Sequence, residues 1–273
     1  MPESTIIDQP DPLAAQEIWK TILQIFDVQR ETQIGWVLST VGALGGFACQ
    51  QAVWKACIEP RNRNPGDFLV KVGTRSGETY YFGEAINQFL MTAFPPRKTF
   101  FGMVAGAIPN PTPENLPDLK EIVEHVAKSV GSKSFGFVRL PKERGAFAVP
   151  RVALSKHWRW VEEALKSAGN PANEWPIILG LVAHRAVKGA QIVMEGSLAA
   201  RLVMEAAIFM SKIDPATVAG ATSGLLPPAQ WNDRALRPER NQEVLTDVLP
   251  LVPTAMPKQG PTGSIHVSPQ SLN

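Results

Sequence analysis

Residues 34–54 read IGWVLSTVGALGGFACQQAVW, 21 consecutive positions without a charged side chain. This length would suit a membrane span. The stretch nevertheless contains several small and polar residues, and no basic flank fixes a membrane orientation: Gly35, Gly42, Gly45, Gly46, Ser39, Thr40, Gln50 and Gln51. A helix that is apolar on all sides is typical of the buried centre of a large helical protein. Because small residues let helices approach closely, we expect a helix over 32–58 to be the buried spine of a globular body, with no membrane partner.

The composition supports a globular protein. Of 273 residues, 44% are apolar and 19% are charged, and 27 basic residues against 25 acidic ones give a formal charge of +2. These values exclude a largely disordered chain, a fibrous repeat and a polyelectrolyte tail. The N-terminus has no basic start and no long apolar run, so we expect no secretory signal and a cytoplasmic protein. Cys49 and Cys57 are eight helical residues apart, about 12 Å, which is too far for a disulfide.

The remaining sequence predicts more helices and little sheet. Apolar spacing predicts helices over 12–29, 83–94 and 114–130, and another after Ser155 with Trp158, Val161 and Leu165 in the core and Gly169 at its end. Residues 173–213 form either one long bent helix or an antiparallel pair turning near Gly189. Residues 67–73 and 78–82 predict a hairpin in which Gly77 takes a left-handed conformation. Residues 134–139 and 146–149 predict short strands. The expected fold class is mainly α (α+β), a multi-helix globular domain with a small β-hairpin.

The composition changes near residue 225, where we predict a domain boundary. The last 49 residues hold eight prolines, too dense for a helix or a central strand. We therefore predict a helical domain over 1–225 and a proline-rich C-terminal arm over 226–273. The arm is either disordered or docked, through the apolar run 244–252, on its own body or on a neighbouring subunit.

One segment has features of a nucleic-acid binder. Residues 133–140, KSFGFVRL, resemble the RNP1 octamer of RNA-recognition domains at six of eight positions, departing at Ser134 and Leu140. The resemblance implies base stacking on Phe135 and Phe137. An RNA-recognition domain also needs a strand between the preceding helix and this octamer, and only Gly131-Ser132 intervene. The surrounding strip 128–160 is basic, with these candidate contacts: Lys142, Arg144, Arg151, His157 and Arg159. The alternative is that this strip pairs with the acidic segment 1–31 of the same or of a second subunit.

Two histidines have candidate partners. His184 shares a helical face with apolar residues, so we expect it to be partly buried. If the chain turns near Gly189, Glu195 comes near it, and a buried His–Glu pair is a candidate catalytic acid–base pair. Glu121 and His125 are one helical turn apart on the polar face of 114–130, which predicts a solvated pair rather than a metal site.

Tyr80, Tyr81 and Glu84 form the last candidate site, at the junction between the hairpin and the next helix. Neighbouring strand residues face opposite sides, so one tyrosine should be in the core and the other is a candidate ligand-binding residue with Glu84. Nucleotide-binding, nucleophile-elbow and metal-binding motifs are absent from the sequence, so we expect no cofactor and no metal. We therefore expect a non-catalytic protein-interaction or small-ligand-binding module that self-associates. There are two alternatives. One is an enzyme that uses His184 and Glu195, and the other is a nucleic-acid binder that uses residues 128–160.

Overall fold

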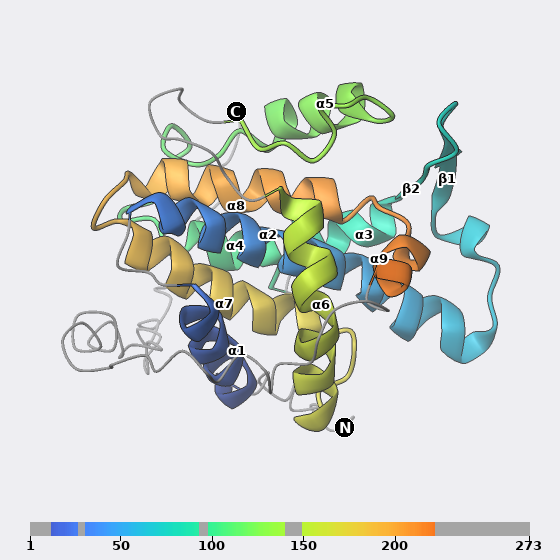
Figure 1. Cartoon of the computed structure of the whole chain (residues 1–273), viewed down its shortest axis with the longest axis horizontal. Helices are drawn as coiled ribbons and strands as arrows, with labels where there is room; N and C mark the ends of the chain where they lie inside the picture. The colour runs from blue at the N-terminus through green and yellow to red at the C-terminus, as the bar shows by residue number, and fades with distance from the viewer. Residues whose placement is uncertain (1–11, 27–30, 93–97, 140–148, 222–273) are drawn as a thin grey trace, which may run out of the picture. The chain divides into compact units, whose positions relative to one another are not determined.

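The computed structural model describes residues 12–26, 31–92, 98–139 and 149–221 (Figure 1). Within these residues the chain forms nine α-helices and one antiparallel hairpin, which confirms the mainly α (α+β) architecture. The elements are α1 Pro12–Ile25, α2 Glu31–Val53, β1 Val70–Gly73, β2 Thr79–Phe82, α3 Glu84–Leu90, α4 Phe100–Ala105, α5 Leu119–Ser129, α6 Pro150–Ser167, α7 Trp175–Ala190, α8 Gly196–Met210 and α9 Pro215–Ala221. The predicted boundary near 225 and the arm over 226–273 lie outside the described residues.

The charge-free segment is buried, as predicted. Every residue from 37 to 53 in α2 is buried, and α2 packs most extensively against α8 and α7. Glycines make this contact possible: a Cβ on Gly42 or Gly46 would overlap the backbone carbonyl oxygens of Val203 or Ala207. The α2 and α8 backbones therefore lie closer together than any larger side chain would allow. Among the described helices, none is long and apolar enough to cross a membrane.

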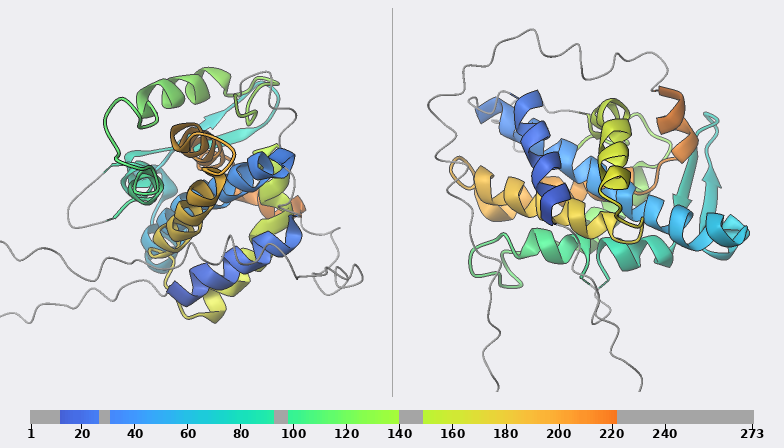
Figure 2. Two further views of the ribbon diagram at one scale, coloured as in Figure 1. Left: turned by 90° about the vertical axis from the view of Figure 1, so that its left-hand side faces the viewer. Right: turned by 90° about the horizontal axis from the view of Figure 1, so that it is seen from below.

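The other helices cover this central group. α1 packs on α7 and α6, and α6 also packs on α2, whereas α5 packs on α8 from another side (Figures 1 and 2). The segment 173–213 is a pair of helices rather than one bent helix. Gly189 lies inside α7, so the chain reverses slightly later than expected, at residues 191–195.

The hairpin is confirmed. Its register pairs Val70 with Phe82 and Gly73 with Thr79, and Gly77 has a φ of 84° in the turn, where glycine carries no steric cost. Figure 1 and the right-hand view of Figure 2 place the hairpin at one margin of the helices, beside α9.

Two predictions about the segment after α5 are wrong: the strand over 134–139, and the stacking face formed by Phe135 and Phe137. Residues 134–139 are turns and irregular backbone rather than a strand. Left-handed Gly131 and Gly136 reverse the chain, and Phe135 packs its ring against Tyr80 and Phe209. Phe137 is exposed, so the two phenylalanines do not form a stacking face.

α6 begins six residues before the predicted start, at Pro150, because proline suits the first position of a helix. Its predicted core residues Trp158, Val161 and Leu165 are buried. Gly169 follows the helix with a φ of 74°, as expected of a residue that ends one. Of the predicted strand 146–149, residues 146–148 lie outside the described part.

Candidate functional site

The two edges of the hairpin have different surroundings. The edge of β2 is tied to the segment after α8, because the Tyr81 amide donates a hydrogen bond to the carbonyl oxygen of Lys212 at 2.7 Å. Tyr80 and Ile213 form an isolated antiparallel bridge next to it. On the same segment, the buried Gln50 side chain of α2 donates to the carbonyl oxygens of Ser211 and Ile213, at 3.2 and 2.8 Å. The segment 211–213 therefore links α2, α8 and β2.

The outer edge of β1 makes no backbone hydrogen bond to another described residue. The Tyr81 amide points away from β1, so its register partner Lys71 points its own amide and carbonyl away from β2. Alternation places the backbone groups of Gly73 on the same outer side. Within the described part of the chain these four groups have no hydrogen-bond partner, and a Cβ on Gly73 would meet no atom within 4 Å. Val70, at the start of this edge, is 64% exposed. As far as the described residues go, β1 therefore has a free backbone edge of the kind to which another strand can add.

Lys212 lies at the edge of β2, where its carbonyl oxygen accepts the hydrogen bond from Tyr81, and the environment of its side chain is unusual for a lysine. The residue is 4% exposed. Its Nζ lies 5.6 Å from the centre of the Phe82 ring. Burial lowers the pKa of Lys212 to about 8, and the nearby Glu84 carboxylate only partly opposes this effect. Burial also raises the pKa of Cys49, so the thiol remains protonated and supplies no negative charge.

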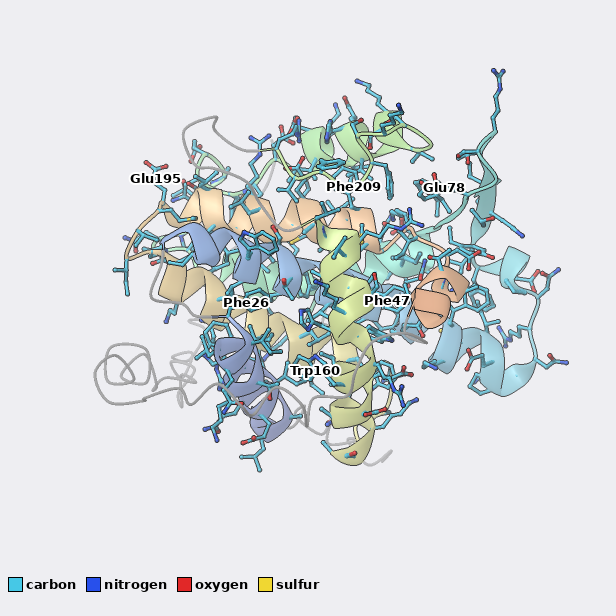
Figure 3. The ribbon with its side chains drawn as sticks, in the orientation of Figure 1. Phe26, Phe47, Glu78, Trp160, Glu195 and Phe209 are labelled. Atoms are coloured by element: carbon cyan, nitrogen blue, oxygen red, sulfur yellow. The ribbon has the colours of Figure 1, made fainter. Side chains whose placement is uncertain are left out.

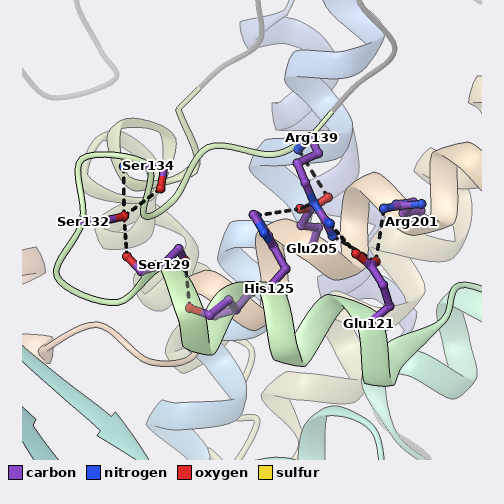
Figure 4. Close-up of polar contacts among 9 residues, drawn as sticks. Glu121, His125, Ser129, Ser132, Ser134, Arg139, Arg201 and Glu205 are labelled. Carbon is purple, nitrogen blue, oxygen red and sulfur yellow. Dashed lines mark hydrogen bonds and ion pairs between the residues drawn. The ribbon is translucent and has the colours of Figure 1, made fainter.

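A second polar cluster joins α5, α8 and residue 139 (Figure 4). Glu205 on α8 is completely buried, and it accepts hydrogen bonds from Arg139 Nε at 2.6 Å and from the Arg139 amide at 3.3 Å. The Arg139 guanidinium also binds both carboxylate oxygens of Glu121, to which Arg201 donates at 3.2 Å. His125 Nε2 lies 3.6 Å from Glu205 Oε1.

The electrostatics of this cluster follow from its geometry. The hydrogen bond from Arg139 holds the pKa of Glu121 below its usual range, whereas burial lowers the pKa of His125 and favours its neutral form. The predicted solvated Glu121–His125 pair is therefore wrong, because each residue takes a different partner. The cluster fastens α5 and the following turns to α8, which is a structural role. Among the described residues, no group of three or more His, Cys, Asp or Glu side chains is arranged to hold a metal ion.

The candidate catalytic residues His184 and Glu195 have separate surroundings. His184 is half-buried, as expected, and its Nδ1 lies 3.0 Å from the carbonyl oxygen of Met103. Burial lowers its pKa. Glu195 is exposed at the N-terminus of α8, at the end of the helices opposite Glu78 in Figure 3. No hydrogen bond or ion pair between described residues joins His184 to Glu195. Their catalytic pairing stays a prediction.

The candidate ligand-binding residues surround the Lys212 segment. Tyr80 is in the core, 2% exposed, with its hydroxyl donating to Glu78 at 3.1 Å. Tyr81 is half-buried, with its ring 5.4 Å from that of Trp54, and its amide binds Lys212. Glu84 is exposed and accepts a hydrogen bond from Asn87 at 3.1 Å. The sequence thus placed Tyr81 and Glu84 correctly at one junction but missed the lysine between them.

The candidate nucleic-acid contacts are distributed over different environments. Arg151 forms an ion pair with Glu78 at 2.8 Å, and exposed Arg159 pairs with Glu163 at 3.1 Å. His157 is buried against Phe26 and Trp160, and burial lowers its pKa to about 4. Lys142 and Arg144 lie outside the described residues. The described arginines among these candidates therefore pair with Glu78 and Glu163. Most of the acidic residues of 1–31 lie outside the described residues, so the pairing of the basic strip with that segment stays a prediction.

Comparison of the chain with protein families, with curated proteins and with solved structures finds no match. The functional assignment therefore depends on the chemistry of the described residues alone. Lys71, Gly73 and Lys212 were not singled out by the sequence, since only the register of the hairpin and its docking on 211–213 give them their environment.

Proposed function

We propose that this protein is a non-catalytic protein-interaction module that associates with a second copy of itself through the open edge of β1. The observation that carries the proposal is the outward orientation of the Lys71 and Gly73 backbone groups, on a strand at the margin of the helices. Edge strands of this kind bind other strands through main-chain hydrogen bonds.

A second copy fits this edge because the edge is complementary to itself. In an antiparallel arrangement centred on Val72, Lys71 of each copy faces Gly73 of the other, and the two residues exchange both backbone hydrogen bonds. No lysine then faces a lysine. The two Val72 side chains meet at the non-hydrogen-bonded position, where Cβ atoms come within about 5 Å of each other. The pairing would extend the two-stranded sheet to four strands across a two-fold axis.

Cysteine cross-linking tests this arrangement. In a Cys57→Ser background, which leaves only the buried Cys49, Val72→Cys places two thiols across the two-fold axis within reach of a disulfide. The matched control is Val70→Cys, on the same strand and the same face but paired with residue 74 of the other copy. We expect light scattering to report a dimer of the full chain, and oxidation to cross-link Val72→Cys at least about tenfold faster than Val70→Cys.

Two results would overturn the proposal. One is a monomeric mass for the unmodified chain at every concentration tested. The other is equal cross-linking of the two cysteine variants, which would indicate random collision instead of a fixed register. A dimer that cross-links through Val70→Cys instead would show that a different register forms.

A further inference from the structure

Lys71 is the only charged residue in the two strands of the hairpin. Its register partner on β2 is Tyr81. Because Val72 pairs with Tyr80, which lies in the core, Lys71 and Gly73 belong to the opposite face of the sheet. Lys71 is exposed there. No hydrogen bond or ion pair joins its side chain to another residue in the described ranges.

The two carboxylates that flank β2 are engaged elsewhere. Glu78 pairs with Arg151 on α6 at 2.8 Å, and Glu84 accepts a hydrogen bond from Asn87 on α3 at 3.1 Å. Neither is therefore available to balance the charge of Lys71. The sheet beside that charge is uncovered, because a Cβ on Gly73 would meet no atom within 4 Å.

Self-pairing through β1 would bring two such charges together, and the inference that follows rests on that proposed arrangement. With Lys71 of each copy opposite Gly73 of the other, the two lysines lie diagonally across the two-fold axis on the outer face. Diagonal positions of this kind are about 7–8 Å apart. Like charges at this separation repel each other, while the two glycines, on the other diagonal, leave the surface between the lysines free of side chains.

We propose that the two-fold axis of this dimer carries a binding site for a doubly charged oxyanion such as phosphate, held between Lys71 of one copy and Lys71 of the other. The site exists only in the dimer, because each copy supplies one of the two ammonium groups. The missing side chain at Gly73 lets a tetrahedral anion approach the sheet, and its two charges balance the two lysines. A ligand that binds only the dimer shifts the equilibrium toward it, so the oxyanion stabilises self-association.

Sedimentation equilibrium of the full chain tests the site at about pH 8, where lysine is charged. One buffer contains about 20 mM phosphate and the other contains chloride at the same ionic strength, so that general screening of charge is equal in both. We expect the dimer dissociation constant to be at least about fivefold lower in phosphate, which corresponds to a phosphate dissociation constant of about 5 mM. Methyl phosphate in place of inorganic phosphate shows whether the site also admits a phosphate group carried by a larger molecule.

Two variants locate the effect. Lys71→Gln removes both ammonium groups and should abolish the preference for phosphate. Its dimer in chloride should be at least as tight as that of the unmodified chain, because the repulsion between the lysines is gone. Arg75→Gln is the matched control, since it removes an exposed cation from the turn of the same hairpin, away from the two-fold axis, and it should keep the full response to phosphate.

Failure of this site and failure of self-association give different results. A dimer that cross-links through Val72→Cys but has the same dissociation constant in phosphate and in chloride would overturn the oxyanion site alone. A phosphate response that persists in Lys71→Gln would do the same, because the ion would then bind elsewhere. A chain that stays monomeric in both buffers would overturn both proposals.

Discussion

Replacing Lys212 by methionine should change how the stability of the protein depends on pH. In the folded state burial lowers the pKa of Lys212 from 10.5 to about 8. At pH values between these two, the unfolded chain holds a proton that the folded chain has lost, so the free energy of unfolding rises with pH. Below about pH 8 both states are protonated and the full penalty applies. The difference between the two pKa values corresponds to about 3 kcal/mol.

The measurement is urea denaturation of both proteins at about pH 6.5 and about pH 9.5. In the unmodified chain about 2 kcal/mol of the penalty should be relieved across this interval. Lys212→Met keeps an unbranched side chain and has no proton to lose, so it should be the more stable protein at the lower pH, and the difference should shrink at the higher pH. The raised pKa values of Tyr80 and Tyr81 affect both proteins alike.

Lys71→Met serves as the control for this experiment, because Lys71 is exposed. It should leave the pH dependence of the unmodified chain unchanged. Parallel pH profiles for the unmodified chain and Lys212→Met would refute the reasoning, since they would mean that the buried amine binds its proton as strongly as it does in the unfolded chain.

Two further substitutions test the packing of α8, by urea denaturation. Gly46→Ala should lower the free energy of unfolding by about 1–3 kcal/mol, because the new methyl group overlaps the backbone of α8. The control is Gly73→Ala, whose methyl group meets open space. If Gly46→Ala destabilised the protein less than Gly73→Ala does, the close contact between α2 and α8 would be contradicted. Arg139→Leu should cost about 3–5 kcal/mol because it removes the guanidinium that pairs with the buried carboxylate of Glu205 and leaves only His125 beside it. Arg159→Leu, which breaks an exposed pair, should cost less than about 1 kcal/mol.

Local patterns were sufficient to predict several elements of the fold. The hairpin depends on the turn glycine Gly77 and on strand-forming residues beside it, all within a few positions. The helical character of 173–213 was visible as apolar spacing, but one long bent helix and a pair turning near Gly189 both remained open, because a single glycine interrupts a helix only weakly. The strand predicted at 134–139 is wrong because a distant contact outweighs the local pattern. Its alternating aromatic residues favour a strand locally, but Phe135 gains more by packing on Tyr80 and Phe209.

The sequence by itself determined that α2 is a buried helix with a glycine face. A continuous apolar surface has to be covered, and glycine marks where a neighbour approaches, whichever neighbour that is. Only the tertiary structure decided that the neighbour is α8, that Arg139 neutralises Glu205 from 66 residues away, and that Lys212 is buried against the Phe82 ring. The physical reason is that side-chain spacing specifies which face of a helix avoids water, whereas burial and pairing of a charge depend on which distant segments fold against it.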